Sequence, residues 1–230
     1  MSVWYTIPSC LPRLEATRCF EAWKEMGYKV AILRQGEPLE ARVCDIQVPT
    51  PFYQGYPVSV NSLVACVLGE DPHCEWVVYG GDDYYPDTTR TARQIAQECC
   101  DWFEGIHPGK PTMGVMQPTG DRSMEGEIDT AAASPWIGRE FCTTIYGGRG
   151  PLWMGYWHYY TDRELQEVAL LQGVFQQRRD LTQLHRHWTR LPGGSPPSHL
   201  WEPIARMGKD RDLFYRRKAD GFPGWDERTK

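Results

Sequence analysis

The chain has 230 residues, of which 41% are hydrophobic and 24% charged, a composition that suits one domain of α/β size with a real core. It contains no apolar run of 18 residues and no basic leader, so we expect no membrane span, no signal peptide and a cytoplasmic location. Its eight cysteines form no C-x-x-C pair and match no zinc-module spacing, which predicts free, mostly buried thiols.

The net charge of −5 is unevenly distributed along the chain. Residues 178–230 carry 12 Lys or Arg and 7 Asp or Glu, a net of +5, which leaves −10 on residues 1–177. An acidic body can hold a metal ion, and a basic end can meet a polyanion. A solvated surface segment is the alternative interpretation of the basic end.

Strand and helix patterns alternate along the first 106 residues. Apolar, β-prone runs predict strands over residues 3–7, 28–33, 42–48 and 75–80, and helical periodicity predicts helices over residues 14–26, 58–69 and 88–106. The continuous apolar run EWVVYG (75–80) is typical of a central parallel strand. This alternation predicts an α/β fold, a single Rossmann-like domain with a mostly parallel mixed sheet.

The second half of the chain has a less regular pattern. It predicts, in order, a strand over 112–118, a polar loop over 121–135, a helix or strand near 136–146, a glycine-rich loop over 147–153, a helix over 162–173 and a short strand within 174–188. The segment LPGGSPPSH (191–199) has the composition of a linker, and a polar tail follows it. We therefore expect one domain over residues 1–190 and a linker with a basic tail over residues 191–230.

Two adjacent acids, Asp82 and Asp83, follow the predicted central strand. In open α/β sheets, ligands bind beyond the carboxyl ends of the strands. Adjacent carboxylates repel each other unless a cation or hydrogen-bond donors compensate them, and hard oxygen ligands suit Mg²⁺ or Mn²⁺, which can also bridge a diphosphate. The alternative is a simple turn, because Gly-Gly-Asp-Asp is favourable turn chemistry.

Three classes of metal-dependent enzyme end a strand in acids. A template-directed polymerase carries its acids in a β-hairpin, whereas here we expect a helix to follow them, and 230 residues are too few. A sugar nucleotidyltransferase needs a glycine-rich loop after the first strand, and IPSCLPR (7–13) contains no glycine. A glycosyltransferase with one nucleotide-binding α/β domain fits both features.

The sequence resembles the GT-A fold glycosyltransferases, close to the large family 2, over roughly residues 1–190. The resemblance rests on TIPS (6–9), Asn61 in GYPVSVNSLV, GGDDYYPD (80–87), GGRGPLW (147–153), HYYTDREL (158–165) and LHRHW (184–188). Two positions depart from the family pattern. Gly81 stands where an Asp-x-Asp motif has its first acid, and LRQGE (33–37) lacks the Asp that usually ends the second strand.

The resemblance implies a metal-dependent transfer of a sugar from a nucleotide-diphosphate sugar, UDP-linked, to an acceptor hydroxyl with inversion. Mn²⁺ or Mg²⁺ would neutralise the leaving diphosphate. The resemblance places the metal ligands at Asp83 and at His185 or His187. It places the donor site at Pro8, Ser9, Arg34, Asn61, Asp82, Gly148 and Arg149.

Asp162 is the candidate general base, with Glu164 as the second candidate, because an inverting displacement needs a carboxylate near the acceptor hydroxyl. The alternative role of Asp162 is an N-cap, since it opens a predicted helix. Three aromatic residues, Trp153, Trp157 and Tyr160, could stack on a sugar, and core packing is their alternative role.

The acceptor is left open by the sequence. The basic end, with RRKADGFPGW (216–225), mixes arginines with aromatic residues and is compatible with DNA, including a hydroxymethylated pyrimidine of the kind that some small viral GT-A enzymes glycosylate. A glycan, protein or small-molecule acceptor is the alternative. A non-catalytic module that binds a nucleotide sugar or nucleic acid through a degenerate GT-A fold is a further alternative.

Overall fold

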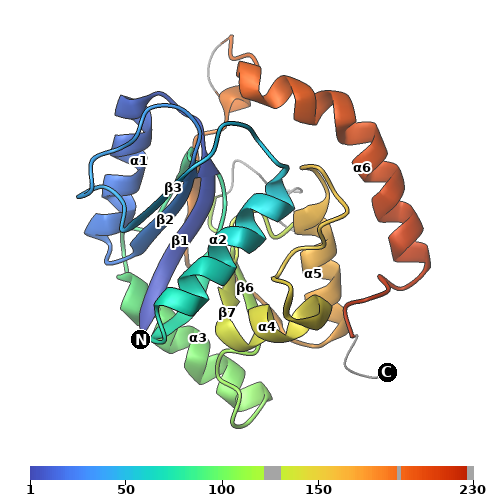
Figure 1. Ribbon diagram of the computed structural model, residues 1–230. Helices are drawn as coiled ribbons and strands as arrows, with labels where there is room; N and C mark the ends of the chain where they lie inside the picture. Colours follow the sequence, from blue (N-terminus) through green and yellow to red (C-terminus); the bar gives the residue numbers. More distant parts are fainter. Residues whose placement is uncertain (122–130, 191–192, 227–230) are drawn as a thin grey trace.

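A seven-stranded mixed sheet forms the centre of the structure, a computed structural model that describes residues 1–121, 131–190 and 193–226 (Figure 1). The strand order is β3 (Ile46–Pro49), β2 (Lys29–Arg34), β1 (Ser2–Ser9), β4 (Cys74–Val78), β7 (Trp136–Gly138), β6 (Val115–Pro118) and β8 (Phe175–Arg178). Strand β7 is antiparallel to both of its neighbours, and the other pairs are parallel. The predicted mostly parallel mixed sheet is confirmed, and β4, the predicted central strand, is the fourth of seven.

Helices cover both faces of this sheet. They are α1 (Arg13–Glu25), α2 (Tyr56–Glu70), α3 (Ala92–Ile106), α4 (Arg139–Thr144), α5 (Thr161–Leu171) and α6 (Trp201–Ala219), with short 3₁₀ turns η2 (Ile145–Gly148), η3 (Trp188–Arg190) and η4 (Ser198–Leu200). Tyr5 of β1 stacks on Trp23 of α1, and Trp76 of β4 packs on Phe103 of α3. Tyr79, which follows β4 and points the opposite way, packs against Tyr56 of α2. Helices α1 and α3 therefore cover one face, and α2 covers the other. No helix of the described residues is long and apolar enough to cross a membrane.

Local sequence signals explain where several helices begin and end. Pro57 lies in the first turn of α2, where its missing N–H costs nothing. Helix α3 begins with a reciprocal capping box between Thr91 and Gln94. The turn after α1 needs Gly27, whose φ is +87°.

The structure corrects four of the predicted elements. The strand predicted over 42–48 is shorter and later, at β3, because a turn occupies residues 41–43. The segment 136–146 contains both a strand, β7, and a helix, α4. A two-residue strand, β5 (Tyr84–Tyr85), directly follows the acids, and it pairs with β9 (Leu184–His185) rather than forming a hairpin with β4. Most of the predicted polar tail forms α6. Residues 122–130 of the predicted polar loop and 191–192 of the predicted linker lie outside the described residues.

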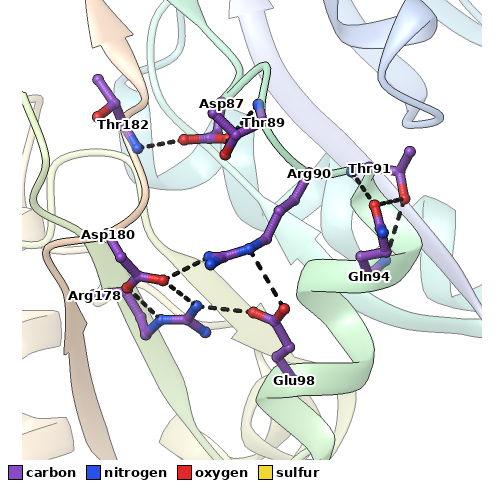
Figure 2. Close-up of polar contacts among 9 residues, drawn as sticks. All are labelled: Asp87, Thr89, Arg90, Thr91, Gln94, Glu98, Arg178, Asp180 and Thr182. Atoms are coloured by element: carbon purple, nitrogen blue, oxygen red, sulfur yellow. Dashed lines mark hydrogen bonds and ion pairs between the residues drawn. The ribbon is translucent and has the colours of Figure 1, made fainter.

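A polar network fixes the connection from β4 to α3 against the connection from β8 to β9 (Figure 2). The carboxylate of Asp87 accepts hydrogen bonds from the backbone N–H groups of Thr89 and Thr182, both at 2.7 Å. Although burial opposes it, these donors hold the pKa of Asp87 below its ordinary value. The guanidinium of Arg178 contacts Asp180 at 2.6 Å and Glu98 of α3 at 2.8 Å. The network brings the region around β9 beside the carboxyl edge of the sheet.

Helix α6 is held against the domain by a buried carboxylate. Asp210, 4% exposed, accepts hydrogen bonds from the backbone N–H groups of Trp157, His158 and Tyr159 at 2.9 to 3.0 Å. The guanidinium of Arg206 lies 3.9 Å from the ring centroid of Trp157. The basic end of the chain is thus in part a packed helix.

A second buried contact holds the C-terminal half of α6. Arg217 donates through Nε and Nη2 to the two carboxylate oxygens of Glu164 at 2.8 and 2.7 Å. Glu164 is 1% exposed and also accepts from the hydroxyls of Tyr146 at 2.7 Å and Tyr156 at 2.6 Å. Each oxygen of the Glu164 carboxylate therefore accepts two hydrogen bonds, one from a tyrosine hydroxyl and one from Arg217.

Replacing Arg217 by Ala should destabilise the protein by about 3–5 kcal/mol, because the Glu164 carboxylate would remain buried without its cation. The measurement is urea unfolding at pH 7. Arg216→Ala is the matched control, since Arg216 is exposed in the same helix and should change stability by less than about 0.5 kcal/mol. Equal midpoints for the two variants would show that α6 is not held by this ion pair.

The stability of the protein should fall between pH 7 and pH 5 through His158. Burial lowers the pKa of His158 to about 4, against an ordinary value of 6.5, while the charge of Asp210 opposes the shift. The unfolded chain binds the proton first, so the stabilisation is complete above about pH 6.5 and is lost as the pH falls toward 4. Wild type should lose about 2 kcal/mol more than His158→Gln between pH 7 and pH 5 in urea unfolding. His73 is exposed, so the control variant His73→Gln should show the same pH dependence of unfolding as wild type. If His158→Gln also shows that pH dependence, the loss of stability between pH 7 and pH 5 does not come from His158.

Candidate functional site

Asp82 and Asp83 lie at the carboxyl edge of the sheet, just beyond β4. One carboxylate oxygen of Asp82 accepts hydrogen bonds from the backbone N–H groups of Cys10 and Leu11, both at 3.0 Å. These donors immediately follow the end of β1, the strand that pairs with β4. Asp82 therefore joins the ends of two adjacent parallel strands at one point.

The turn that carries the acids begins with two glycines, at which an added side chain would displace a neighbouring side chain. The hydroxyl of Tyr5 donates to the carbonyl of Gly81, and that of Tyr56 donates to the carbonyl of Gly80. A Cβ on Gly80 would lie 2.9 Å from the hydroxyl of Ser134, and one on Gly81 would lie 2.3 Å from a carboxylate oxygen of Asp83. The departure from Asp-x-Asp at Gly81 thus has a steric cause, since the Asp83 carboxylate occupies the space that a side chain there would need.

His185 meets Asp83 across the pairing of β5 with β9. Its Nε2 lies 3.1 Å from Oδ2 of Asp83, and its ring stacks on the ring of Tyr84 with centroids 3.9 Å apart. The backbone N–H of Arg186 donates to the carbonyl of Asp83 at 2.9 Å. Residues 102 positions apart in sequence thus form one rigid contact.

The two adjacent acids have opposite pKa shifts. Burial raises the pKa of Asp82, the N–H of Leu11 opposes that shift, and the charge of Asp83 adds to it. Burial also acts to raise the pKa of Asp83, but the hydrogen bond and charge of His185 outweigh it and lower the pKa below its ordinary value. Asp83 is therefore the carboxylate of the pair that stays ionised most readily, as a metal ligand must.

The Asp83–His185 pair fits a divalent cation. A carboxylate oxygen and an imidazole nitrogen are both ligands of divalent ions such as Mn²⁺, and in this structure Nε2 and Oδ2 lie 3.1 Å apart, within hydrogen-bond distance of each other. Over the described residues, no group of three or more His, Cys, Asp or Glu side chains is arranged to hold a metal ion. The residues present therefore suit an ion that takes its other ligands from water and substrate oxygens, as Mg²⁺ commonly does.

Four other predicted residues lie near these acids or support their surroundings. His187 is turned toward Thr189, whose hydroxyl lies 2.7 Å from its Nδ1, so His185 rather than His187 contacts Asp83. Pro8 and Ser9 end β1, and the Ser9 hydroxyl accepts from the buried guanidinium of Arg34, at the end of β2, at 2.9 Å. These residues occupy the same edge of the sheet as the acids.

Asn61 and the glycine loop have a different arrangement from the expected donor site. The side-chain amide of Asn61 exchanges two hydrogen bonds with the backbone of Leu152, at 2.7 and 3.1 Å. Gly148 lines a cavity of about 290 Å³ with Leu68 and Gly69, at the end of α2 that precedes β4. Arg149 lies beside Gly148 and donates through Nε to the carbonyl of Tyr146. The structure places Gly148 and Arg149 away from the carboxyl edge, because the loop runs down α2 rather than over the acids.

The two candidate bases lie in different environments. Asp162, in the first turn of α5, accepts a hydrogen bond from the backbone N–H of Arg163 at 2.9 Å. The pKa of the Tyr84 hydroxyl is raised chiefly by burial, and the charges of Asp83 and Asp162 raise it further. Asp162 is therefore close to the site. Glu164 is not available to an acceptor, because its ion pair with Arg217 and two tyrosine hydroxyls occupy it. The choice of Glu164 as second candidate is not supported by its position.

The aromatic residues considered for sugar stacking pack against α6. Arg217 lies 3.9 Å from the ring centroid of Trp153, and Arg206 lies at the same distance from that of Trp157. The ring of Tyr160 lies 5.3 Å from that of Phe214. The alternative role, packing, describes all three.

Sequence reasoning missed Asp121 and Arg190, which also lie beside the acids. Oδ2 of Asp121 accepts from the N–H of His185 at 3.1 Å and from Nη1 of Arg190 at 2.8 Å. Asp121 lies in a polar loop and Arg190 in a short turn, and no motif marks either position. Only the chain's path from β6 to β9 brings them together.

No protein-family model and no curated protein matches the chain. Among solved structures, the catalytic domain of Drosophila β1,4-galactosyltransferase 7, in complex with xylobiose, aligns with a TM-score of 0.52 at 10% identity over 86% of this chain and 75% of that one. A197 from STIV aligns with a TM-score of 0.49 at 13% identity over 81% and 86%. A glycosyltransferase involved in glycosylation of the major capsid of PBCV-1 gives 0.45 at 10% identity over 77% and 82%. The galactosyltransferase likeness shows the fold, and the expected GT-A fold class is confirmed.

Replacing Gly81 by Ala should weaken Mn²⁺ binding roughly 10- to 100-fold in the presence of UDP, because the new methyl group displaces the Asp83 carboxylate. The measurement is a titration of Mn²⁺ followed by electron paramagnetic resonance. Gly105→Ala is the matched control, since an added Cβ there meets no atom within 4 Å. If the two variants bind Mn²⁺ equally, the turn does not position a metal ligand.

Proposed function

We propose that this chain is a metal-dependent glycosyltransferase that transfers a sugar from a UDP-sugar to an acceptor hydroxyl with inversion. The observation that carries the proposal is the contact between Asp83 and His185, at 3.1 Å, beyond the central strand of a GT-A fold sheet. Ligands of open α/β sheets bind at this edge. The Drosophila protein that shares the fold is a galactosyltransferase.

In this proposal Asp83 and His185 hold Mn²⁺ or Mg²⁺, which supplies neutralisation of the charge that develops on the leaving diphosphate. Asp82 is fixed by two backbone N–H groups, so its remaining oxygen can orient water or the donor sugar. The stacking of His185 on Tyr84 and the hydrogen bond from its backbone to Asp121 hold the imidazole in position. The role of these neighbours is to keep the two ligands preorganised.

The donor nucleoside lies, in this proposal, over the ends of β1 and β2. Pro8 is partly exposed there, while Ser9 and Arg34 are buried and hydrogen-bonded to each other, and the carbonyl of Glu37 also accepts from Arg34 at 2.9 Å. Asn61 contributes by holding the segment at Leu152 against α2. The burial of Arg34, 3% exposed, suits a positioning role better than direct contact with the base.

Asp162 is the proposed general base. Burial raises the pKa of the hydroxyls of Tyr79 and Tyr84, and the charge of Asp162 adds to both shifts. Its carboxylate would accept the proton of the acceptor hydroxyl as that oxygen attacks the sugar carbon.

As acceptor we propose a hydroxyl carried by a DNA base, a hydroxymethylated pyrimidine. The support is the set of exposed basic side chains on α6, which includes Lys209, Arg211 and Arg216. Such side chains neutralise phosphates, and an enzyme acting on a duplex base must flip it out of the stack. A screen of donors and acceptors, with hydroxymethylated DNA, glycans and peptides, read by mass spectrometry, tests this choice. Transfer only to a glycan or peptide would overturn the DNA acceptor and leave the glycosyltransferase proposal standing.

Incubation with UDP-sugars and Mn²⁺ should give slow hydrolysis that Asp83→Ala reduces roughly 100-fold or more, because the variant loses an ionised metal ligand. The release of UDP measures the rate. Asp101→Ala, which removes an exposed carboxylate on α3, should leave the rate unchanged. If wild type neither hydrolyses a nucleotide sugar nor binds a nucleoside diphosphate with Mn²⁺, the chain is a binding module of another kind and the enzyme proposal fails.

A further inference from the structure

Arg190 has hydrogen-bond donors that the protein does not use. Its Nη1 donates to Asp121 at 2.8 Å. Its Nε and Nη2 are covered from solvent, and no atom of the described chain accepts from them. A buried donor without an acceptor destabilises the folded protein, because it loses its hydrogen bonds to water and gains none in return. Such groups in native proteins therefore call for an explanation.

The two unused nitrogens form one edge of the guanidinium. Nε and Nη2 present parallel N–H groups, the fork that matches the two oxygens of a carboxylate or phosphate. Elsewhere in this protein the same edge holds an anion, since Arg217 binds Glu164 and Arg178 binds Asp180 through Nε and Nη2. At Arg190 the opposite corner, Nη1, is bound and the fork has no acceptor among the described residues.

Arg190 lies beside the Asp83–His185 pair. A single oxygen of Asp121 accepts from both the Arg190 side chain and the His185 backbone. The charge of Arg190 also acts on the hydroxyl of Tyr84, together with the charge of Asp83. The fork therefore belongs to the same edge of the sheet as the acids.

Two other arginines of the described residues near this edge have partners of their own. The guanidinium of Arg186 lies 4.2 Å from the ring centroid of Tyr85, and that of Arg34 is bound to Ser9 and to the carbonyl of Glu37. Arg190 ends η3, a three-residue turn in which no residue is buried. A segment with so little packing moves at low cost.

We infer that Arg190 binds the diphosphate of the nucleoside-diphosphate leaving group through Nε and Nη2. This inference rests on the proposed function and adds a second positive group to its site. Asp82, Asp83 and Asp121 make the edge strongly acidic. The charge of one divalent cation therefore does not suffice to attract a diphosphate there, and a further positive group is needed. Asp121 orients Arg190 and His185 together and so aligns the two groups that meet the diphosphate.

The test measures binding of UDP and GDP, each with Mn²⁺, and of the nucleosides uridine and guanosine, by calorimetry and ligand-detected NMR. Arg190→Lys keeps a cation for Asp121 but has no fork, and Arg190→Gln removes the charge. Both should weaken binding of the preferred diphosphate roughly 10- to 100-fold and change nucleoside binding little, because the fork meets only the phosphates. Thermal unfolding checks that each variant is folded, and Arg190→Lys carries the test if Arg190→Gln is not.

Arg186→Gln is the matched control, since it removes an equal charge four residues before Arg190. This variant should bind the diphosphate as wild type does. Diphosphate affinities for the Arg190 variants equal to that of the control overturn the inference and leave the proposed function intact. Equal weakening of diphosphate and nucleoside also overturns it, because that result indicates a structural role. If wild type binds Mn²⁺ but neither diphosphate, the proposed function and this inference fail together.

Discussion

The site depends on one constraint, the close packing around the Gly80–Gly81 turn, where an added Cβ would displace Ser134 or the Asp83 carboxylate. Hydroxyls from both faces of the sheet, those of Tyr5 and Tyr56, hold the carbonyls of this turn, and the Asp83 carboxylate folds back over Gly81. That arrangement directs Asp82 toward the end of β1 and Asp83 toward β9. Two adjacent acids thereby acquire different partners and opposite pKa shifts.

The partners of these acids come from distant parts of the chain, so the surrounding contacts must be rigid. The pairing of β5 with β9 sets the height of His185 opposite Asp83. The network around Asp87 and Arg178 fixes the approach of β9 from outside the sheet. A short strand of two residues suffices because charged and polar contacts on either side restrain it.

In helix α6, some of the charged residues near the end of the chain have a structural role. Asp210 and Arg217 are buried and bind the segments around Trp157 and Glu164, so two of the residues that looked like surface charge are structural. A bound pair of this kind stabilises the docked helix chiefly because either partner left alone would be a buried, uncompensated charge. The same contact removes Glu164 from the chemistry and leaves Asp162, two residues earlier in the chain, as the remaining candidate base.

The sequence by itself determined the α/β class, the central strand, the order of the first six elements and the pair Asp82–Asp83, because apolar periodicity and the position of charges at strand ends are local properties. The resemblance to a family motif also led to His185 and His187 as alternatives. Only the tertiary structure decided which histidine contacts Asp83. It also decided that Gly148 and Arg149 lie along α2, away from the acids, and that Asp121 contacts Arg190. These contacts join residues far apart in sequence, and their geometry depends on strand register and on how loops pack, neither of which a local pattern records.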